Sequence, residues 1–148
     1  MPRWKLLSLV ALTLPLLILS APGAHASISE TGDIKATIDH PFMIGNTTLP
    51  PGHYNFRMLP ATDRMAMVAT SANDATSVEF QVRPSSPRES PAQHTQLIFD
   101  RYGKIEILKD IYVAGSRTGV AILEPSRAEK RLQNQGQKPE SHTEESQP

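Results

Sequence analysis

The sequence predicts an all-β fold, a small antiparallel β-sandwich or barrel with one short C-terminal helix. Two observations lead to this prediction. Apolar residues recur at every second position from Ile34 onward, and polar turn residues separate these runs at short intervals. A period of two residues is typical of half-buried strands. Evenly spaced short strands with polar turns favour an antiparallel sandwich or a barrel.

The first strand shows the pattern clearly, because Ile34, Ala36 and Ile38 share one face and polar residues occupy the other. The same alternation predicts eight or nine short strands in the chain. After the first, they centre on Phe42, Tyr54, residues 65–69, Val78, Leu97, Ile105, Ile111 and Val120.

Two turns are predicted in the first half of the chain. Gly45-Asn46 suits the positive φ angles of a tight hairpin. Pro51-Gly52 is a suitable central pair for a type II turn, because proline presets φ and glycine accepts a positive φ. This turn would lead directly into the strand that carries Tyr54.

One helix is predicted, beginning after Ser126. Ser126 and Glu129 have the spacing of a capping box, in which each side chain accepts a hydrogen bond from the other residue's backbone N–H. Ala128 and Leu132 fall on one face of the helix, at positions i and i+4. We expect this helix to pack across an open end of the sheet or barrel.

The composition divides the chain into three segments. Residues 1–26 contain Arg3 and Lys5, an apolar stretch of 14 residues and the small-residue site Ala24-His25-Ala26, which is the layout of a secretory signal peptide. A spanning helix needs about 20 apolar residues, so we expect cleavage rather than a stable membrane anchor. Residues 27–133 are predicted to form a single β-domain. Residues 134–148 contain no apolar residue, and we expect a disordered polar tail there.

The predicted export places the protein in the periplasm or outside the cell. Removing 26 of the 148 residues leaves 122, a length that suits one domain. The signal peptide holds two of the 15 basic residues and none of the 15 acidic ones, so the remaining chain has 13 against 15 and a net charge of −2. This balance offers no basic face, and we expect no nucleic-acid partner. Because the chain has no cysteine, its hydrophobic core must hold the fold without disulfides.

Four motifs occur in a fixed order and resemble a family of small exported β-proteins abundant in acidobacteria. They are Leu-Pro-x-Gly-x-Tyr at residues 49–54, Leu-x-Phe-x-Arg-Tyr-Gly at 97–103, Gly-x-x-x-Gly at 115–119 and Ser-x-x-Glu at 126–129. The resemblance covers nearly all of the chain after the signal peptide. It implies export and an all-β fold, and it carries over no catalytic residues.

The residue types that catalysis requires are not grouped in this sequence. The chain has no cysteine, no G-x-S-x-G nucleophile elbow and no glycine loop for phosphate or dinucleotide. The carboxylates of Asp39, Glu79, Asp100 and Glu106 fall on polar strand faces or in turns, where solvated carboxylates are the ordinary expectation. We therefore expect no enzyme and no cofactor, and a minor envelope hydrolase is the second alternative.

The expected role is the binding of an envelope protein or a glycan. Arg101, Tyr102 and Tyr112 are the candidate binding residues, because exposed aromatic side chains suit a glycan. In the competing interpretation, Tyr102 folds over the rim of the sheet and Arg101 pairs with Asp100.

A periplasmic copper-binding protein is the first alternative. Met65 and Met67 put two thioethers on one strand face, and His53 offers an imidazole. Thioether and imidazole ligands suit Cu(I). Methionine on an alternating strand is more often core filler, however. The alternative therefore depends on whether these three side chains converge.

Overall fold

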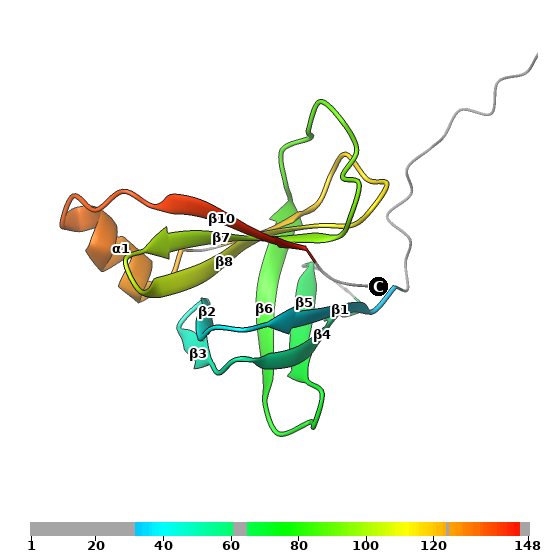
Figure 1. The fold of residues 1–148 in the computed structure, drawn as a ribbon, viewed down its shortest axis with the longest axis horizontal. Coiled ribbons are helices and arrows are strands. Elements are labelled where there is room, and N and C mark those ends of the chain that lie inside the picture. Colours follow the sequence, from blue (N-terminus) through cyan, green and yellow to red (C-terminus); the bar gives the residue numbers. More distant parts are fainter. Residues whose placement is uncertain (1–31, 61–64, 124, 146–148) are drawn as a thin grey trace, which may run out of the picture.

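The computed structural model describes residues 32–60, 65–123 and 125–145, and the predicted signal peptide lies outside them. The described chain contains ten strands and one helix, which confirms the predicted all-β fold (Figure 1). The strands are β1 (Ile34–Ile38), β2 (Phe42–Ile44), β3 (Thr47–Leu49), β4 (Gly52–Met58), β5 (Ala66–Ser71), β6 (Ser77–Pro84), β7 (Gln96–Tyr102), β8 (Ile105–Tyr112), β9 (Val120–Ile122) and β10 (Glu140–Glu145). The helix is α1 (Arg127–Asn134).

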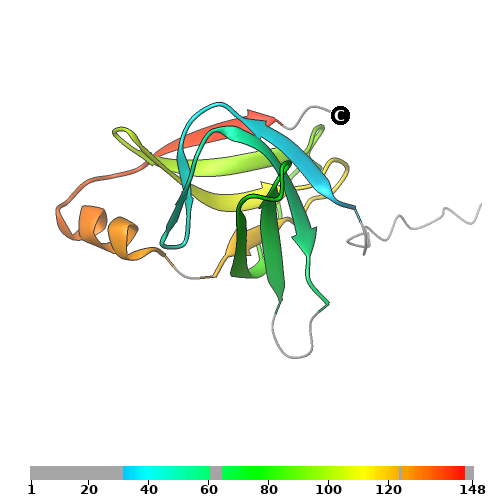
Figure 2. The ribbon, with the colours of Figure 1, turned by 90° about the horizontal axis from the view of Figure 1, so that it is seen from below.

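The strands form one sheet that curls on itself without closing. Hydrogen-bonded neighbours follow the order β1-β4-β5-β6-β9-β8-β7-β10, and the β2–β3 hairpin joins another part of β8. Within the described chain β1 pairs only with β4, and β10 pairs only with β7. Along the main path of pairing the two ends of the sheet are β1 and β10, which lie on the same side of the molecule (Figure 2). β3 forms a third edge, at the end of the branch that β2 and β3 make. This open arrangement is that of a small sandwich rather than a barrel.

One strand pair departs from the predicted antiparallel pattern. β2 runs parallel to β8, with Phe42 opposite Glu106 and Met43 opposite Ile107. The reason is the short connection after β1, in which the chain crosses from one half of the sheet to the other within three residues, 39–41. β2 therefore arrives beside β8 without a hairpin that would reverse its direction.

The inward faces of the curled sheet hold the alternating apolar residues. Phe42, Phe56 and Phe99 are fully buried. The rings of Phe42 and Phe99 meet edge to face with centroids 5.9 Å apart, and those of Phe42 and Tyr54 do so at 5.1 Å. Edge-to-face pairs of this kind add to the stabilisation that burial provides. The core therefore joins strands from both halves of the sheet.

Helix α1 begins where the sequence predicts, but the capping box is only half formed. The Ser126 side chain accepts a hydrogen bond from the Glu129 backbone N–H at 2.9 Å. The Glu129 carboxylate turns instead to Lys109 on β8, whose Nζ lies 2.8 Å away. Gln133 Nε2 donates to the Tyr102 hydroxyl at 3.2 Å, so the helix packs on the β7–β8 hairpin. Among the described residues, no helix combines the length and apolar character needed to cross a membrane.

Replacing the N-cap, Ser126→Ala, is expected to lower the free energy of unfolding by about 1 kcal/mol, because the Glu129 N–H then loses its acceptor. Urea unfolding followed by circular dichroism measures this loss. Ser90→Ala, at an exposed serine, is the matched control and should leave the midpoint unchanged. An equal loss in both variants would contradict the role of the cap.

Asp110 on β8 provides a pH-dependent prediction. Burial raises the pKa of its carboxyl group, against the opposing effect of Lys109, Arg83 and Arg88. The folded state therefore binds this proton more tightly than the unfolded chain does. The free energy of unfolding should fall as pH rises from the ordinary pKa of 3.8 through the folded value, and that loss should persist at neutral pH.

The free energy of unfolding of Asp110→Asn, measured relative to that of the unaltered protein, is accordingly expected to be higher at pH 7 than at pH 3. Urea unfolding at both pH values tests this, with Glu79→Gln, at an exposed carboxylate on β6, as the control. A relative stability of Asp110→Asn that does not change with pH would contradict the assignment.

The segment predicted to be a disordered tail contains strand β10. It pairs antiparallel with β7, with His142 opposite Phe99 and Glu144 opposite Leu97. The prediction of disorder is wrong for residues 140–145 because it relied on the lack of apolar residues. β10 adds to a sheet edge through backbone hydrogen bonds, which need no apolar side chain.

Candidate metal centre

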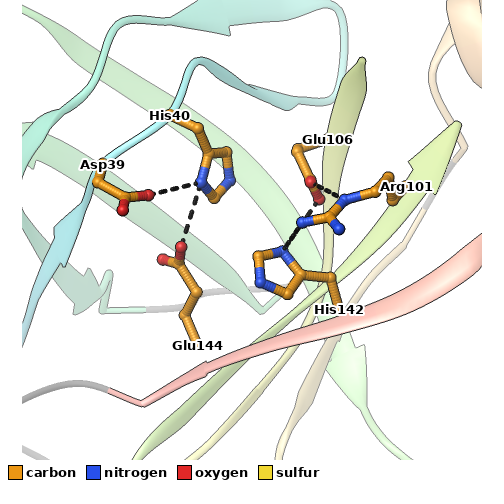
Figure 3. A network of polar contacts seen from close by, with 6 residues as sticks. All are labelled: Asp39, His40, Arg101, Glu106, His142 and Glu144. Atoms are coloured by element: carbon orange, nitrogen blue, oxygen red, sulfur yellow. Dashed lines mark hydrogen bonds and ion pairs between the residues drawn. The ribbon is translucent and has the colours of Figure 1, made fainter. Parts of the chain in front are cut away.

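A group of two histidines and three carboxylates lies where the two ends of the sheet meet (Figure 3). It consists of Asp39, His40, Glu106, His142 and Glu144, and we call these five residues the seam cluster. Asp39 and His40 follow β1, Glu106 belongs to β8, and His142 and Glu144 belong to β10. Because β1 and β10 are not neighbours in the sheet, side chains of the seam cluster join its two ends.

The register of β10 explains why His142 and Glu144 reach the seam cluster. They lie opposite Phe99 and Leu97, both of which are fully buried. Residues two apart on a strand share a face, so both β10 side chains point to the inward side of the sheet. Glu106 is buried on β8, on the other side of β7 from β10.

His40 has one ring nitrogen whose lone pair is unused. Its Nδ1 lies 3.1 Å from Asp39 Oδ1 and 3.1 Å from Glu144 Oε1. Ionised carboxylates only accept hydrogen bonds, so Nδ1 carries a hydrogen, and when the ring is neutral its lone pair is on Nε2. That Nε2 is buried and has no hydrogen-bond partner among the described residues. Carboxylates that hold an imidazole from behind in this way are typical of metal sites.

His142 also presents a lone pair, at Nδ1. Arg101 Nη2 lies 2.8 Å from this atom, and a guanidinium group can only donate. Nδ1 of His142 is therefore the acceptor in this contact. Glu106 Oε2 lies 3.4 Å from the same nitrogen, and Glu106 Oε1 accepts a hydrogen bond from Arg101 Nε. Arg101 thus borders the seam cluster. Its hydrogen bond uses the lone pair of His142 Nδ1, and a metal ion bound to this nitrogen would replace that hydrogen bond.

The ligand atoms lie close to the separations that a small metal ion requires. His40, Glu106 and His142 each offer one atom, and the three atoms lie within 4.8 Å of one another. Ligands of tetrahedral Zn²⁺, at about 2.0–2.1 Å from the ion, stand roughly 3.4 Å apart. Small side-chain rotations would therefore bring the three atoms into place. The nitrogen and oxygen ligands suit Zn²⁺ or Cu²⁺ rather than Cu(I).

The charge of the seam cluster also favours a cation. Burial raises the pKa of the Glu144 carboxyl group, and the nearby carboxylates of Asp39 and Glu106 raise it further, while His40 and His142 lower it when their rings are protonated. Three carboxylates gather here against the guanidinium of Arg101. A divalent cation would balance this excess of negative charge.

The structure does not bring the three candidate binding residues together. Arg101 pairs with Glu106 rather than with Asp100. Tyr102 is buried beside α1, near the β7–β8 turn. Tyr112 is buried at the opposite end of this hairpin, where its hydroxyl donates to the Ser86 carbonyl at 3.2 Å. Neither tyrosine offers an exposed ring to a glycan.

The Met/His set proposed for copper does not converge either. Met67 is fully buried in the core, and Met65 packs against the core from a half-buried position. His53 is exposed on the outer face of β4, where its Nδ1 lies 2.7 Å from Thr37 Oγ1. Because Met67 points inward and His53 points outward, these side chains cannot share one ion.

The sequence analysis missed His40, His142 and Glu144. Two signals for them are visible in the sequence, the adjacent pair Asp39-His40 and the spacing of two residues between His142 and Glu144. Asp39-His40 and the β10 residues come together only because β10 pairs with β7.

Two cavities lie elsewhere on the described part of the chain. One, of about 730 Å³, lies over β1, β4 and β5. The other, of about 460 Å³, lies between the β2–β3 turn and strands β6 and β9. Neither is lined by a residue of the seam cluster.

No family model, no curated protein and no solved structure matches this chain.

Proposed function

We propose that this chain is an exported, non-catalytic β-domain that binds one divalent transition-metal ion, Zn²⁺ or Cu²⁺, at the seam cluster. The observation that carries the proposal is the buried, unpartnered Nε2 of His40, whose Nδ1 is held by two carboxylates. His40 Nε2, His142 Nδ1 and one oxygen of Glu106 are the three protein ligands. Asp39 and Glu144 orient His40 from behind.

Binding is favoured over catalysis by the surroundings of the seam cluster. A catalytic metal keeps an open coordination position beside a substrate cavity. Neither of the two cavities described above includes a residue of the seam cluster, so neither would place a substrate beside the proposed ion. The location in the periplasm or outside the cell rests on the signal peptide predicted from residues 1–26.

A competition titration tests this function. The purified protein, without a histidine tag, is titrated with Zn²⁺ and separately with Cu²⁺ against a chromophoric chelator. We expect one ion per chain. Glu144→Gln, which weakens only the support of His40, should lower the affinity by about 10- to 100-fold. His40→Ala and His142→Ala, which each remove a ligand, should lower it further.

His53→Ala is the matched control, because it removes an exposed imidazole outside the seam cluster. Its affinity should equal that of the unaltered protein. Unchanged affinity in both His40→Ala and His142→Ala would overturn the proposal, and so would the absence of binding in the unaltered protein.

A further inference from the structure

The outer face of the sheet carries a hollow that shares no residue with the seam cluster. This is the cavity of about 730 Å³ over β1, β4 and β5. The outward side chains of the three strands form its floor, and they are charged, hydroxyl-bearing or amide-bearing with one valine among them. These floor residues are Lys35, Thr37, His53, Asn55, Arg57, Val68 and Thr70.

The strand register gathers three basic side chains on this floor. Lys35 lies opposite Asn55, so its diagonal neighbours on β4 are His53 and Arg57. Diagonal neighbours on one sheet face stand about 7–8 Å apart. Lys35 and Arg57 form no ion pair within residues 32–60, 65–123 and 125–145. Asp74 is the one acidic residue that lines the hollow.

Neutral polar groups surround Lys35 and Arg57 and are held in place by hydrogen bonds. Thr37 Oγ1 lies 2.7 Å from His53 Nδ1. Asn55 Nδ2 donates to Asp33 Oδ2 at 3.0 Å. Thr70 Oγ1 lies 3.3 Å from the Ser77 hydroxyl. A ligand with both carboxylates and hydroxyls would therefore find donors for the first and partners for the second.

We propose that this hollow binds a segment of an acidic polysaccharide, through the carboxylates of its uronic acid units. Lys35 and Arg57 pair with a carboxylate, and Thr37 and Thr70 bind sugar hydroxyls. Lys35 and Arg57 are the two cations of the floor, against Asp74 at its border and Asp33 beside Asn55, and they favour an anionic polymer over a neutral one. This inference is independent of the metal function.

Two other anionic polymers fit the hollow less well. Single-stranded nucleic acids are bound through stacking on several exposed aromatic rings. Of the two rings in the lining, Tyr54 points into the core and only the imidazole of His53 is exposed. An acidic peptide in extended form adds to an open strand edge through its backbone. β4 is already paired on both sides with β1 and β5, and a peptide added to the open edge of β1 would extend the sheet sideways rather than lie over the floor.

Calorimetric titration with a galacturonic acid octamer tests the inference. A metal chelator is present, so that the seam cluster has no influence on the result. We expect binding of the octamer, no binding of a neutral maltose oligomer of equal length, and weaker binding at higher salt. The double variant Lys35→Gln/Arg57→Gln should bind about tenfold more weakly.

Lys104→Gln/Lys130→Gln is the matched control, because both lysines are exposed and lie outside the hollow. It removes the same net charge and should retain the affinity. Equal weakening in the two double variants, equal binding of the neutral oligomer, or tighter binding of a single-stranded DNA or an acidic peptide would overturn the proposal.

Discussion

Saturation with Zn²⁺ is expected to raise the free energy of unfolding by about 4 kcal/mol when the free ion is about 1,000 times its dissociation constant. The physical reason is that the three ligands come from distant parts of the sequence. His40, Glu106 and His142 meet only after β1, β8 and β10 have assembled. The unfolded chain therefore binds the ion weakly, and mass action favours the folded state. Urea unfolding with and without Zn²⁺ measures the difference.

The variants make this result specific to the seam cluster. His142→Ala should unfold at the same urea concentration with and without Zn²⁺, because it lacks one ligand. His53→Ala should keep the full effect, since this imidazole hydrogen-bonds to Thr37 on the outer face of the sheet. Equal stabilisation of His142→Ala and the unaltered protein would show that the ion binds elsewhere.

The second large effect is expected in β10, whose amide hydrogen exchange should slow by about 100-fold when free Zn²⁺ is about 100 times its dissociation constant. β10 contains no apolar residue and has a single neighbour, β7, so it should be released easily. The proposed ion binds His142 on β10 and also His40 and Glu106 on the rest of the sheet. Release of β10 would then require the ion to dissociate first.

Hydrogen exchange followed by mass spectrometry measures this protection in peptides that cover residues 137–145. In His142→Ala, Zn²⁺ should leave the exchange of these peptides unchanged. If the unaltered protein binds one ion and β10 still exchanges at its metal-free rate, His142 is not a ligand and the proposed coordination is wrong.

The strands and the helix start could be predicted because they depend on local patterns. Alternation with period two reports which side chains a sheet buries, and β1 and β2 therefore have the predicted positions. Gly45 adopts a positive φ of 57° in its hairpin, as its sequence context predicts. The Ser126 cap depends on residues only three positions apart.

Pro51-Gly52 shows the limit of local patterns. Gly52 is part of β4 and is not among the glycines with positive φ, so the predicted type II turn does not form there. The Tyr54 hydroxyl instead donates to the Pro50 carbonyl at 2.7 Å. Tyr54 is buried by the fold. We infer that its hydrogen bond to Pro50 sets the start of β4, against the turn preference of Pro51-Gly52.

The seam cluster could not be predicted because its members meet only through long-range strand pairing. His142 lies in a segment whose composition indicates disorder, and Asp39-His40 has the character of a turn. β10 joins the sheet through its backbone, which leaves no apolar pattern in the sequence. The metal residues proposed from the sequence failed for a related reason. Met67 and His53 lie on opposite faces of the sheet, since Met67 is buried and His53 is exposed. The alternation of side chains along each strand implies this once the buried face is known.

The most direct test of the metal centre is a long-range ¹H–¹⁵N spectrum of the histidine side chains, recorded with and without one equivalent of Zn²⁺. We predict that His40 Nε2 and His142 Nδ1 move to the shifts of metal-bound nitrogen, while His40 Nδ1 keeps its hydrogen. The signals of His53 and His94 should stay in place. If the His40 and His142 signals do not move, or if those of His53 and His94 move instead, the seam cluster is not the metal site.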